Sequence, residues 1–214
     1  MIEKNWIKEI WEWIYCILIA IAIAIFVKYF LCTPTVVQMD SMYPTLKQGD
    51  RLLLNRTVKT FKIQLKRGDI ITFEAPTKEK YSDMENVNLN NPVAQYDNNK
   101  TSLIKKFNYN VLEIGKKNYI KRVIGLPGEH VQIIEGKVYI NGELLKENYL
   151  DESVTTEAMG KFYDIVVPEN SLFVMGDHRS VSLDSRSFGC IPYSKIESRV
   201  AFRFWPLNKF GKVE

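Results

Sequence analysis

A long apolar run near the N-terminus constrains this chain more than any other feature. Residues 13–27, WIYCILIAIAIAIFV, carry no charged side chain, and KYFLC extends the run to Cys32 with a single lysine. At a rise of about 1.5 Å per residue, a helix over residues 11–31 is about 30 Å long, which matches the hydrocarbon core of a bilayer. We therefore predict a transmembrane helix over residues 11–31.

A cleaved signal peptide is the competing interpretation of this run. It predicts a short apolar region followed by small residues in an A-x-A-like pattern, but FLCTPTVV contains no such pattern. Three tryptophans, Trp6, Trp11 and Trp13, lie at one end of the run, and Tyr29 and Phe30 lie at the other. Aromatic residues gather in this way at the two interfaces of a membrane span. The anchor is therefore favoured.

Basic residues around the run favour an N-terminus on the cytoplasmic side of a cytoplasmic membrane. Lys4 and Lys8 precede the run, whereas Lys28 lies at its far end, and acidic residues count little in this rule. The chain then divides into a short cytoplasmic N-terminus, one membrane-spanning helix and an extracytoplasmic domain, at residues 1–10, 11–31 and 32–214.

Composition limits the classes of function that remain. The 214 residues allow one sizeable domain, and 46% hydrophobic with 25% charged residues is a globular composition. A net charge of +4 suits an anionic surface but is too weak to indicate nucleic-acid binding. The three cysteines form no CxxC pair and there are only two histidines, so we predict no structural metal site.

Beyond residue 32 the sequence has the pattern of β-strands. Two short apolar runs each follow a near-repeat, LKQG or LKRG, and HVQIIEGKVYINGELL contains two turn signals, Glu135-Gly136 and Asn141-Gly142. No long segment in this part keeps a helical period of 3.6 residues. We predict a mainly β domain of antiparallel strands, with strands within residues 50–58, 69–76, 118–128, 130–145 and 171–177.

One segment does not have this pattern. Residues 77–118 are rich in asparagine and lysine and only weakly patterned. They are interpreted as a polar insertion between two strands, either a solvated loop without a specific role or a mobile flap.

Ser41, in the stretch MDSMYPTL, is either a turn hydroxyl or a nucleophile. A nucleophilic serine needs a base, and histidine or lysine can serve. Both histidines, His130 and His178, lie in polar turns, where a solvated side chain is the ordinary outcome. Lys121 lies in the apolar stretch NYIKRVIGL, so a fold can bury it and lower its pKa; the alternative is a strand lysine that points to solvent.

Four blocks, in order, resemble the type I signal peptidases, or leader peptidases, which are membrane-anchored serine proteases with a Ser-Lys dyad. The blocks are SMYPTL (41–46), RGDIITF (67–73), YIKRVIGLPGE (119–129) and MGDHRSVSLDSRSFGCIP (175–192). The C-terminal AFRFWPLNKFG is also similar to the tail of the single-span, Gram-positive-type branch. The resemblance covers nearly the whole of the chain after the apolar run.

The resemblance implies a catalytic set. Ser41 is the expected nucleophile, Lys121 its general base and Ser182 the serine that hydrogen-bonds the lysine and orients it. The backbone N–H of Ser41 is expected to donate to the oxyanion. Asp184 and Arg186 are expected to form an ion pair that shapes the site.

The resemblance also implies supporting and substrate-binding residues. Asp177 and Arg179 are expected to support the loop that carries Ser182. Small apolar pockets for the substrate residues before the cut are expected from residues around the dyad, namely Val37, Met39, Met42, Leu46, Tyr119 and Ile120.

The implied function is cleavage of N-terminal signal peptides from exported preproteins through an acyl-enzyme, at the outer face of the cytoplasmic membrane. No cofactor or metal is expected. The expected partners are preproteins and membrane lipid, with the secretion translocon as a further candidate, and no nucleic acid.

The chain departs from the family pattern at two positions near the dyad and in the insertion at 77–118. Met39 stands where the family has a small residue, and His178 replaces the asparagine of the usual GDNRxxS. Two rival functions remain at this point. One is a non-catalytic or narrowly dedicated assembly factor, for example for pilus subunits. The other, a self-cleaving Ser-Lys repressor, needs a DNA-binding N-terminus where this chain has an apolar run.

Overall fold

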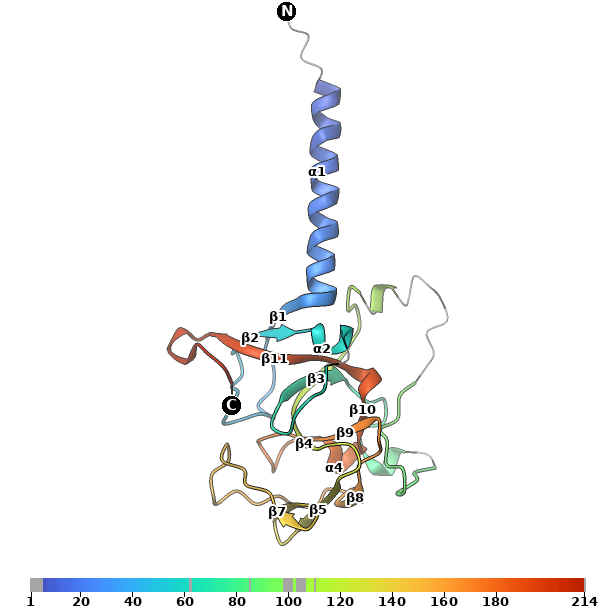
Figure 1. The fold of residues 1–214 in the computed structure, drawn as a ribbon, viewed down its shortest axis with the longest axis vertical. Coiled ribbons are helices and arrows are strands. Elements are labelled where there is room, and N and C mark those ends of the chain that lie inside the picture. The colour runs from blue at the N-terminus through green and yellow to red at the C-terminus, as the bar shows by residue number, and fades with distance from the viewer. Residues whose placement is uncertain are drawn as a thin grey trace, which may run out of the picture.

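The protein consists of a long N-terminal helix that stands on a β-rich domain (Figure 1). This computed structural model describes residues 6–61, 63–84, 86–97, 102, 107–109 and 111–213. The first five residues of the predicted cytoplasmic segment lie outside the described residues. So do residues 85, 98–101, 103–106 and 110 of the predicted insertion.

The N-terminal helix α1 (Trp6–Phe26) continues without a break into the π-helical turn η1 (Val27–Leu31). The stretch Lys8–Leu31 is 24 residues long with a mean hydropathy of 2.5 in its most apolar part, none of which is buried by the rest of the protein. By length and composition, this helix is able to cross a membrane. It begins five residues before the predicted start at residue 11.

The domain contains two antiparallel sheets. The larger has the order β1-β2-β11-β3-β4-β9-β10, and its strands are β1 (Cys32–Val36), β2 (Arg51–Asn55), β3 (Ile70–Glu74), β4 (Asn118–Gly125), β9 (Ser171–Met175), β10 (Ile191–Pro192) and β11 (Ile196–Trp205). The smaller has the order β7-β6-β5-β8, and its strands are β5 (His130–Ile134), β6 (Lys137–Ile140), β7 (Glu143–Leu144) and β8 (Asp164–Val166). It lies at the end of the domain farthest from α1 (Figure 1). The predicted fold class, mainly antiparallel β with one apolar N-terminal helix, is confirmed.

Short helical turns connect the strands. They are α2 (Thr57–Thr60), α4 (Ser185–Phe188) and the 3-10 turns η2 (Tyr81–Asp83), η3 (Tyr193–Lys195) and η4 (Leu207–Lys209). The strand expected within residues 50–58 is β2, which ends at Asn55, and α2 follows it. The side chain of Asn55 accepts hydrogen bonds from the backbone N–H and the hydroxyl of Thr57, at 2.9 and 2.7 Å, and so starts the helical turn.

Both predicted hairpin turns of the smaller sheet are present. Glu135 and Gly136 have φ of 49° and 76°, and Asn141 and Gly142 have φ of 52° and 84°. Two successive residues with positive φ are typical of the type I′ turn, whose twist suits a two-residue hairpin. The strands β5, β6 and β7 are therefore adjacent because of local turn chemistry.

Part of the predicted insertion packs on the core. Val93 forms a bridge with Cys190, and the backbone N–H of Cys190 donates to the carbonyl of Pro92 at 2.7 Å. Ala94 is buried in the same cluster as Phe188 and Ile191. The last residue of the predicted insertion, Asn118, is the first residue of β4.

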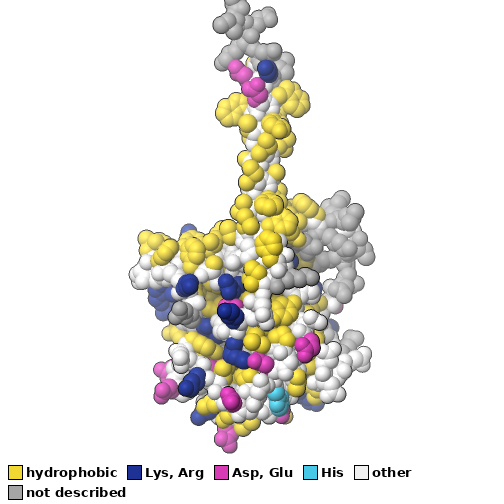
Figure 2. Space-filling model, viewed as in Figure 1, with side chains coloured by type: hydrophobic (Ala, Val, Ile, Leu, Met, Phe, Trp, Pro, Cys, Tyr) yellow, Lys and Arg dark blue, Asp and Glu magenta, His cyan; other side chains and the backbone are white. Residues whose placement is uncertain are grey.

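Hydrophobic side chains are exposed at the end of the domain nearest α1 (Figure 2). In the hairpin that follows β11, Trp205, Leu207 and Phe210 are 48%, 70% and 64% exposed. Phe61 and Ile63, after α2, are also exposed. Exposed apolar surface beside an apolar helix is suited to contact with lipid.

We predict that Gly125→Ala destabilises the domain by about 1–3 kcal/mol, because the site is already full. A Cβ at this position in β4 would lie 2.6 Å from Val131 Cγ2 and 2.9 Å from Val167 Cγ2. The free energy of unfolding should be measured for Gly125→Ala and for Gly125→Ala combined with Val131→Ala. Room made at residue 131 should relieve the clash, so strictly additive losses would contradict this account.

Candidate active site

Ser41 and Lys121 meet although 80 residues separate them in the chain. Ser41 lies in the turn that follows β1, and Lys121 lies on β4 opposite Ile71 of β3. The Nζ of Lys121 is 2.6 Å from the Oγ of Ser41, which is hydrogen-bond distance. Ser41 is partly exposed and Lys121 is only 2% exposed, so the serine is the more accessible of the two residues.

Burial lowers the pKa of Lys121 to about 8, because a charged amine loses its hydration there. The carboxylates of Asp184 and Asp177 act in the opposite direction, and the guanidinium of Arg186 adds to the lowering. The Tyr119 ring, with its centroid 5.5 Å from Nζ, forms part of the wall around the amine. A lysine in this state is able to accept a proton near neutral pH.

A compact turn holds Ser41 in place. Tyr43 N–H donates to the carbonyl of Asp40 at 3.0 Å, and Leu46 N–H donates to that of Met42 at 2.8 Å. Met42 and Leu46 are completely buried in a cluster with Val37, Leu52, Leu54 and Ile70. These two side chains therefore anchor the turn to the hydrophobic core.

A buried ion pair joins this turn to β4 and to the loop after β9. Arg122 donates to both carboxylate oxygens of Asp177, at 2.9 and 2.8 Å, and Thr45 Oγ1 donates to the same carboxylate at 2.5 Å. His178, the next residue, donates from its backbone N–H to the carbonyl of Ser41 at 3.1 Å. The segments that carry Ser41, Lys121 and Asp177 are thus tied together at one place.

A second buried ion pair closes the loop itself. Arg186 donates to both oxygens of Asp184 at 2.8 Å, and neither side chain is exposed. Asp184 also accepts from the backbone N–H of Gly176 at 3.0 Å, and Arg186 donates to the carbonyl of Arg179 at 2.8 Å. The ion pair expected from the sequence is therefore present, and it fixes both ends of the loop.

Arg179 and Asp177 do not pair with each other. Arg179 is bound by Glu147 and Thr156, and its Nε donates to the carbonyl of Gly176 at 3.1 Å. Sequence reasoning did not assign Glu147 or Arg122. Arg122 could have been found from the sequence. It lies next to Lys121 in an apolar stretch, and adjacent side chains of a strand point to opposite faces, so a second buried basic residue was to be expected. Glu147 lies in an unpatterned stretch that carried no such signal.

Ser182 lies close to the dyad but does not hydrogen-bond Lys121 in this structure. Its hydroxyl is buried and has no hydrogen-bond partner among the described residues. A Cβ added to Gly176 would overlap this hydroxyl and the carbonyl oxygen of Ser41. The absence of a side chain at Gly176 is thus what allows Ser182 and Ser41 to lie this close together.

The histidines do not provide the base. His130 lies on β5 and its Nε2 is 2.5 Å from Asp164. His178 Nδ1 is 3.2 Å from the carbonyl oxygen of Asp40, and its ring lies against Tyr43. Among the residues that the structure describes, no three His, Cys, Asp or Glu side chains cluster so as to hold a metal ion.

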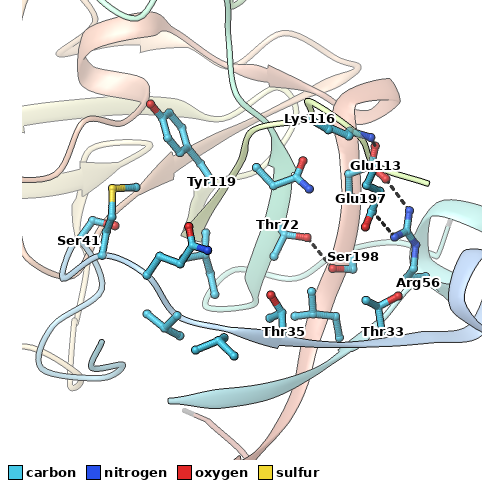
Figure 3. Close-up of a pocket in the computed structure, with 17 residues that line it drawn as sticks. Thr33, Thr35, Ser41, Arg56, Thr72, Glu113, Lys116, Tyr119, Glu197 and Ser198 are labelled. Atoms are coloured by element: carbon cyan, nitrogen blue, oxygen red, sulfur yellow. Dashed lines mark hydrogen bonds and ion pairs between the residues drawn. The ribbon is translucent and has the colours of Figure 1, made fainter. Parts of the chain in front are cut away.

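A cavity of about 280 Å³ extends from Ser41 to Arg56, Glu113 and Glu197 (Figure 3). Of the predicted substrate-binding residues, Val37, Met39, Tyr119 and Ile120 line it and Met42 and Leu46 do not. The remaining lining residues come from β1, β2, β3, β4, β11 and the segments that follow β1 and β2 or precede β4. They are Thr33, Thr35, Val36, Gln38, Leu54, Arg56, Thr72, Glu113, Lys116, Asn118, Glu197 and Ser198.

Comparison with known proteins identifies the family. The model of a family described as signal peptidase, peptidase S26, matches residues 10–205. The chain belongs to this signal peptidase family. Membership makes it a peptide-bond hydrolase and confirms the resemblance seen in the four sequence blocks.

Individual relatives match this signal peptidase over nearly its whole length. Signal peptidase I of Bacillus licheniformis is 32% identical, with 99% of this chain and 98% of that protein covered. Signal peptidase I T of Bacillus subtilis (strain 168) is 35% identical, with 95% and 89% covered. Signal peptidase IB of Staphylococcus aureus (strain COL) is 32% identical, with 95% and 93% covered.

We predict that Ser182→Ala and Asp184→Asn differ sharply in their effect on the stability of this signal peptidase. Asp184→Asn leaves Arg186 charged and buried without its counter-ion, which costs about 3–5 kcal/mol. Ser182→Ala removes a hydroxyl that has no partner among the described residues, so it should change the free energy of unfolding by less than about 1 kcal/mol. Thermal unfolding in detergent measures both. An equal loss in the two variants would contradict the prediction.

Proposed function

We propose that this chain is a membrane-bound serine endopeptidase that cleaves N-terminal signal peptides from preproteins by a Ser41–Lys121 dyad. One observation carries the proposal: the buried amine of Lys121, with its pKa lowered to about 8, lies 2.6 Å from Ser41 Oγ. A lysine paired with a carboxylate would keep its proton, whereas this one has a hydroxyl as its neighbour. Family membership supports signal peptides as the substrate.

The proposed chemistry has two halves. Neutral Lys121 takes the proton of Ser41 as Oγ attacks the carbonyl carbon of the scissile bond. The C–N bond then breaks, the proton goes to the leaving amine, and the signal peptide remains bound to Ser41 as an ester. In the second half, Lys121 takes a proton from water, the resulting hydroxide attacks the ester, and the proton returns to Ser41.

The oxyanion of each half needs hydrogen-bond donors. The backbone N–H of Ser41 is a suitable donor, because it has no acceptor among the described residues. One such donor contributes roughly 3–4 kcal/mol to transition-state stabilisation. Met39 has no side-chain donor, so a second donor must come from another group or from the backbone.

Two free strand edges support an extended substrate. Residues 118–121 of β4 pair with β3, and the pairing of β4 with β9 begins only at Arg122. The strand β1 pairs with β2, and Val37 continues that pairing with Asp50. An extended peptide is able to add to such edges, and small side chains before the cut would lie against Val37, Met39, Tyr119 and Ile120. Met42 and Leu46 act indirectly, through the position of the turn.

The proposed location is the cytoplasmic membrane, with α1 as a single span, the N-terminus inside and the domain on the outer face. The apolar helix and the exposed hydrophobic residues at its base support contact with lipid. Such an arrangement would place Ser41 beside preproteins that are themselves held in the membrane, in reach of the secretion translocon.

Cleavage of a panel of preproteins in detergent tests the proposal. Wild type should release mature proteins, and Ser41→Ala and Lys121→Ala should each lose about 1,000-fold or more in kcat/KM, because each removes one half of the dyad. Ser153→Ala and Lys137→Ala, both at exposed positions away from the cavity, are matched controls. A folded wild type that cuts nothing would reject the proposal and favour an assembly factor without catalysis.

We also predict that kcat/KM rises with pH and levels off above an apparent pKa near 8, since only neutral Lys121 accepts a proton.

The pKa of Lys121 also affects the stability of the protein. The folded pKa of about 8 lies below the ordinary 10.5, so unfolding takes up a proton between these two values and the free energy of unfolding rises with pH across that window. Denaturant titrations over this range measure the effect.

Lys121→Met is the control for this linkage. It removes the buried amine while keeping the apolar volume, so it should be more stable than wild type by about 2–4 kcal/mol at pH 7. The difference should shrink as pH approaches 10.5. A pH-independent difference would show that Lys121 does not titrate as proposed.

A further inference from the structure

The cavity that begins at Ser41 ends in a cluster of charged side chains. Figure 3 shows Ser41 and Tyr119 at one end and Arg56, Glu113, Lys116 and Glu197 at the other. Between them lie Thr72 and Ser198, whose hydroxyls are 2.5 Å apart. The dyad does not use this charged end, and the apolar pockets near Ser41 do not reach it.

The charged cluster is held together by ion pairs. Arg56 donates to Glu113 at 2.6 Å and to Glu197 at 2.9 Å, and Lys59 lies 2.8 Å from Glu197. Lys116 also pairs with Glu197. Burial raises the pKa of Glu197, but Lys116 and Lys59 outweigh this and lower it, so the carboxylate stays charged.

The cluster has more cations than carboxylates. Arg56, Lys59 and Lys116 face the two carboxylates of Glu113 and Glu197, and Lys28, 3.8 Å from Glu113, adds a fourth cation at the membrane side. The local potential is therefore positive, and it attracts an acceptor or an anion more than a second cation.

Arg56 provides a second, independent indication. The residue is 4% exposed and lines the cavity, and both terminal nitrogens of its guanidinium are paired. Its Nε, however, has no hydrogen-bond partner among the described residues. A buried N–H without an acceptor is costly, so Arg56 is held at the cavity by its two ion pairs although one of its own donors is unsatisfied.

The position of the cluster relative to the scissile bond follows from the strands. Lys116 lies five residues before Lys121, and Thr33 at the same end lies eight residues before Ser41. The extended parts of these two stretches, residues 118–121 of β4 and 33–36 of β1, advance about as far per residue as an extended substrate does. The backbone N–H of Arg56 donates to the carbonyl of Leu31 in η1 at 2.9 Å, so this end of the cavity is the end next to η1. A substrate with its apolar segment in the membrane would pass it before it reaches Ser41.

We propose that this charged end is a second substrate subsite, which takes a hydrogen-bond acceptor, best a carboxylate, about five to eight residues before the scissile bond. Arg56 and Lys116 are its specificity-determining residues. The inference rests on the proposed function for the direction in which the substrate lies. It adds a polar requirement to the small apolar pockets beside the dyad.

The test uses the full-length enzyme in detergent and peptides that span ten residues before the cut and three after it. Positions five to eight before the cut are changed one at a time to Asp, Asn or Lys in an alanine background. For wild type, kcat/KM for the Asp peptide should exceed that for the Lys peptide on the order of ten-fold at one of these positions, with Asn between them. The same changes three residues after the cut should have no such effect.

One variant that removes a cation and one that removes a carboxylate test whether the preference arises at the charged cluster. Lys116→Gln should lower the Asp-to-Lys ratio and Glu113→Gln should raise it, each by about three-fold or more. Lys137→Gln, which removes the same charge from an exposed position on β6, should leave the ratio unchanged. A ratio of two substrates on one preparation does not depend on the fraction of folded enzyme, so a merely structural role would not move it.

Binding separates this inference from the proposed function. Fluorescence anisotropy of the same peptides on Ser41→Ala measures the subsite without cleavage, and the Asp peptide should bind more tightly than the Lys peptide. Cleavage without any Asp-over-Lys preference at the four positions, or variant ratios equal to that of Lys137→Gln, would overturn the subsite. A binding preference without cleavage by wild type would keep the subsite and overturn the peptidase.

Discussion

The site depends on how one buried amine, that of Lys121, is surrounded. Lys121 has its pKa lowered by burial, yet the carboxylates of Asp177 and Asp184 lie near enough to act against that lowering. Each of these carboxylates is held by its own arginine, Asp177 by Arg122 and Asp184 by Arg186. The arginines neutralise the carboxylates, so the site is able to use buried acids as scaffold without giving Lys121 a counter-ion.

The same pairs determine the geometry of the site. Arg122 follows Lys121 directly, and alternation along the strand sends the two side chains to opposite faces of β4. One face then brings the amine to Ser41, while the other binds Asp177 and, through it, Thr45 of the turn that carries Ser41. Two adjacent residues of one strand thus supply both the amine beside Ser41 and the ion pair that holds the turn of Ser41 in place.

Local chemistry explains what could be predicted from the sequence. Each hairpin turn, Glu135-Gly136 and Asn141-Gly142, is determined by its own two residues, so the turns were predictable. The apolar helix was predictable from the length of the apolar run alone. The closeness of Ser41 and Lys121 came from the resemblance of sequence blocks, since 80 residues of separation carry no local signal. The four blocks were informative because together they contain the turn of Ser41, nearly all of the strands β3 and β4, and the loop and α4 that follow β9.

Tertiary packing decided the rest. Met42 and Leu46 are apolar and close to Ser41 in sequence, which suggested pocket residues, but the turn directs both inward to the core. For Arg179 the sequence indicated support of the loop but not the partner, which is Glu147, a residue 32 positions earlier in the chain. Pairing between charged residues depends on which of several possible partners the fold brings within reach, and single-sequence patterns do not contain that information.

The difference in exposure between Ser41 and Lys121 matters for the proposed mechanism. Ser41 is partly exposed at one end of the cavity, whereas Lys121 is only 2% exposed. In that mechanism, substrate would reach the serine hydroxyl while the amine stays shielded from bulk water. Tyr119, two residues before Lys121 on β4, lines the cavity, and its ring centroid lies 5.5 Å from the amine. In the proposed mechanism this one side chain would affect both the fit of small residues before the cut and the basicity of Lys121. A substitution of Tyr119 that enlarges the pocket would then also admit water to the amine.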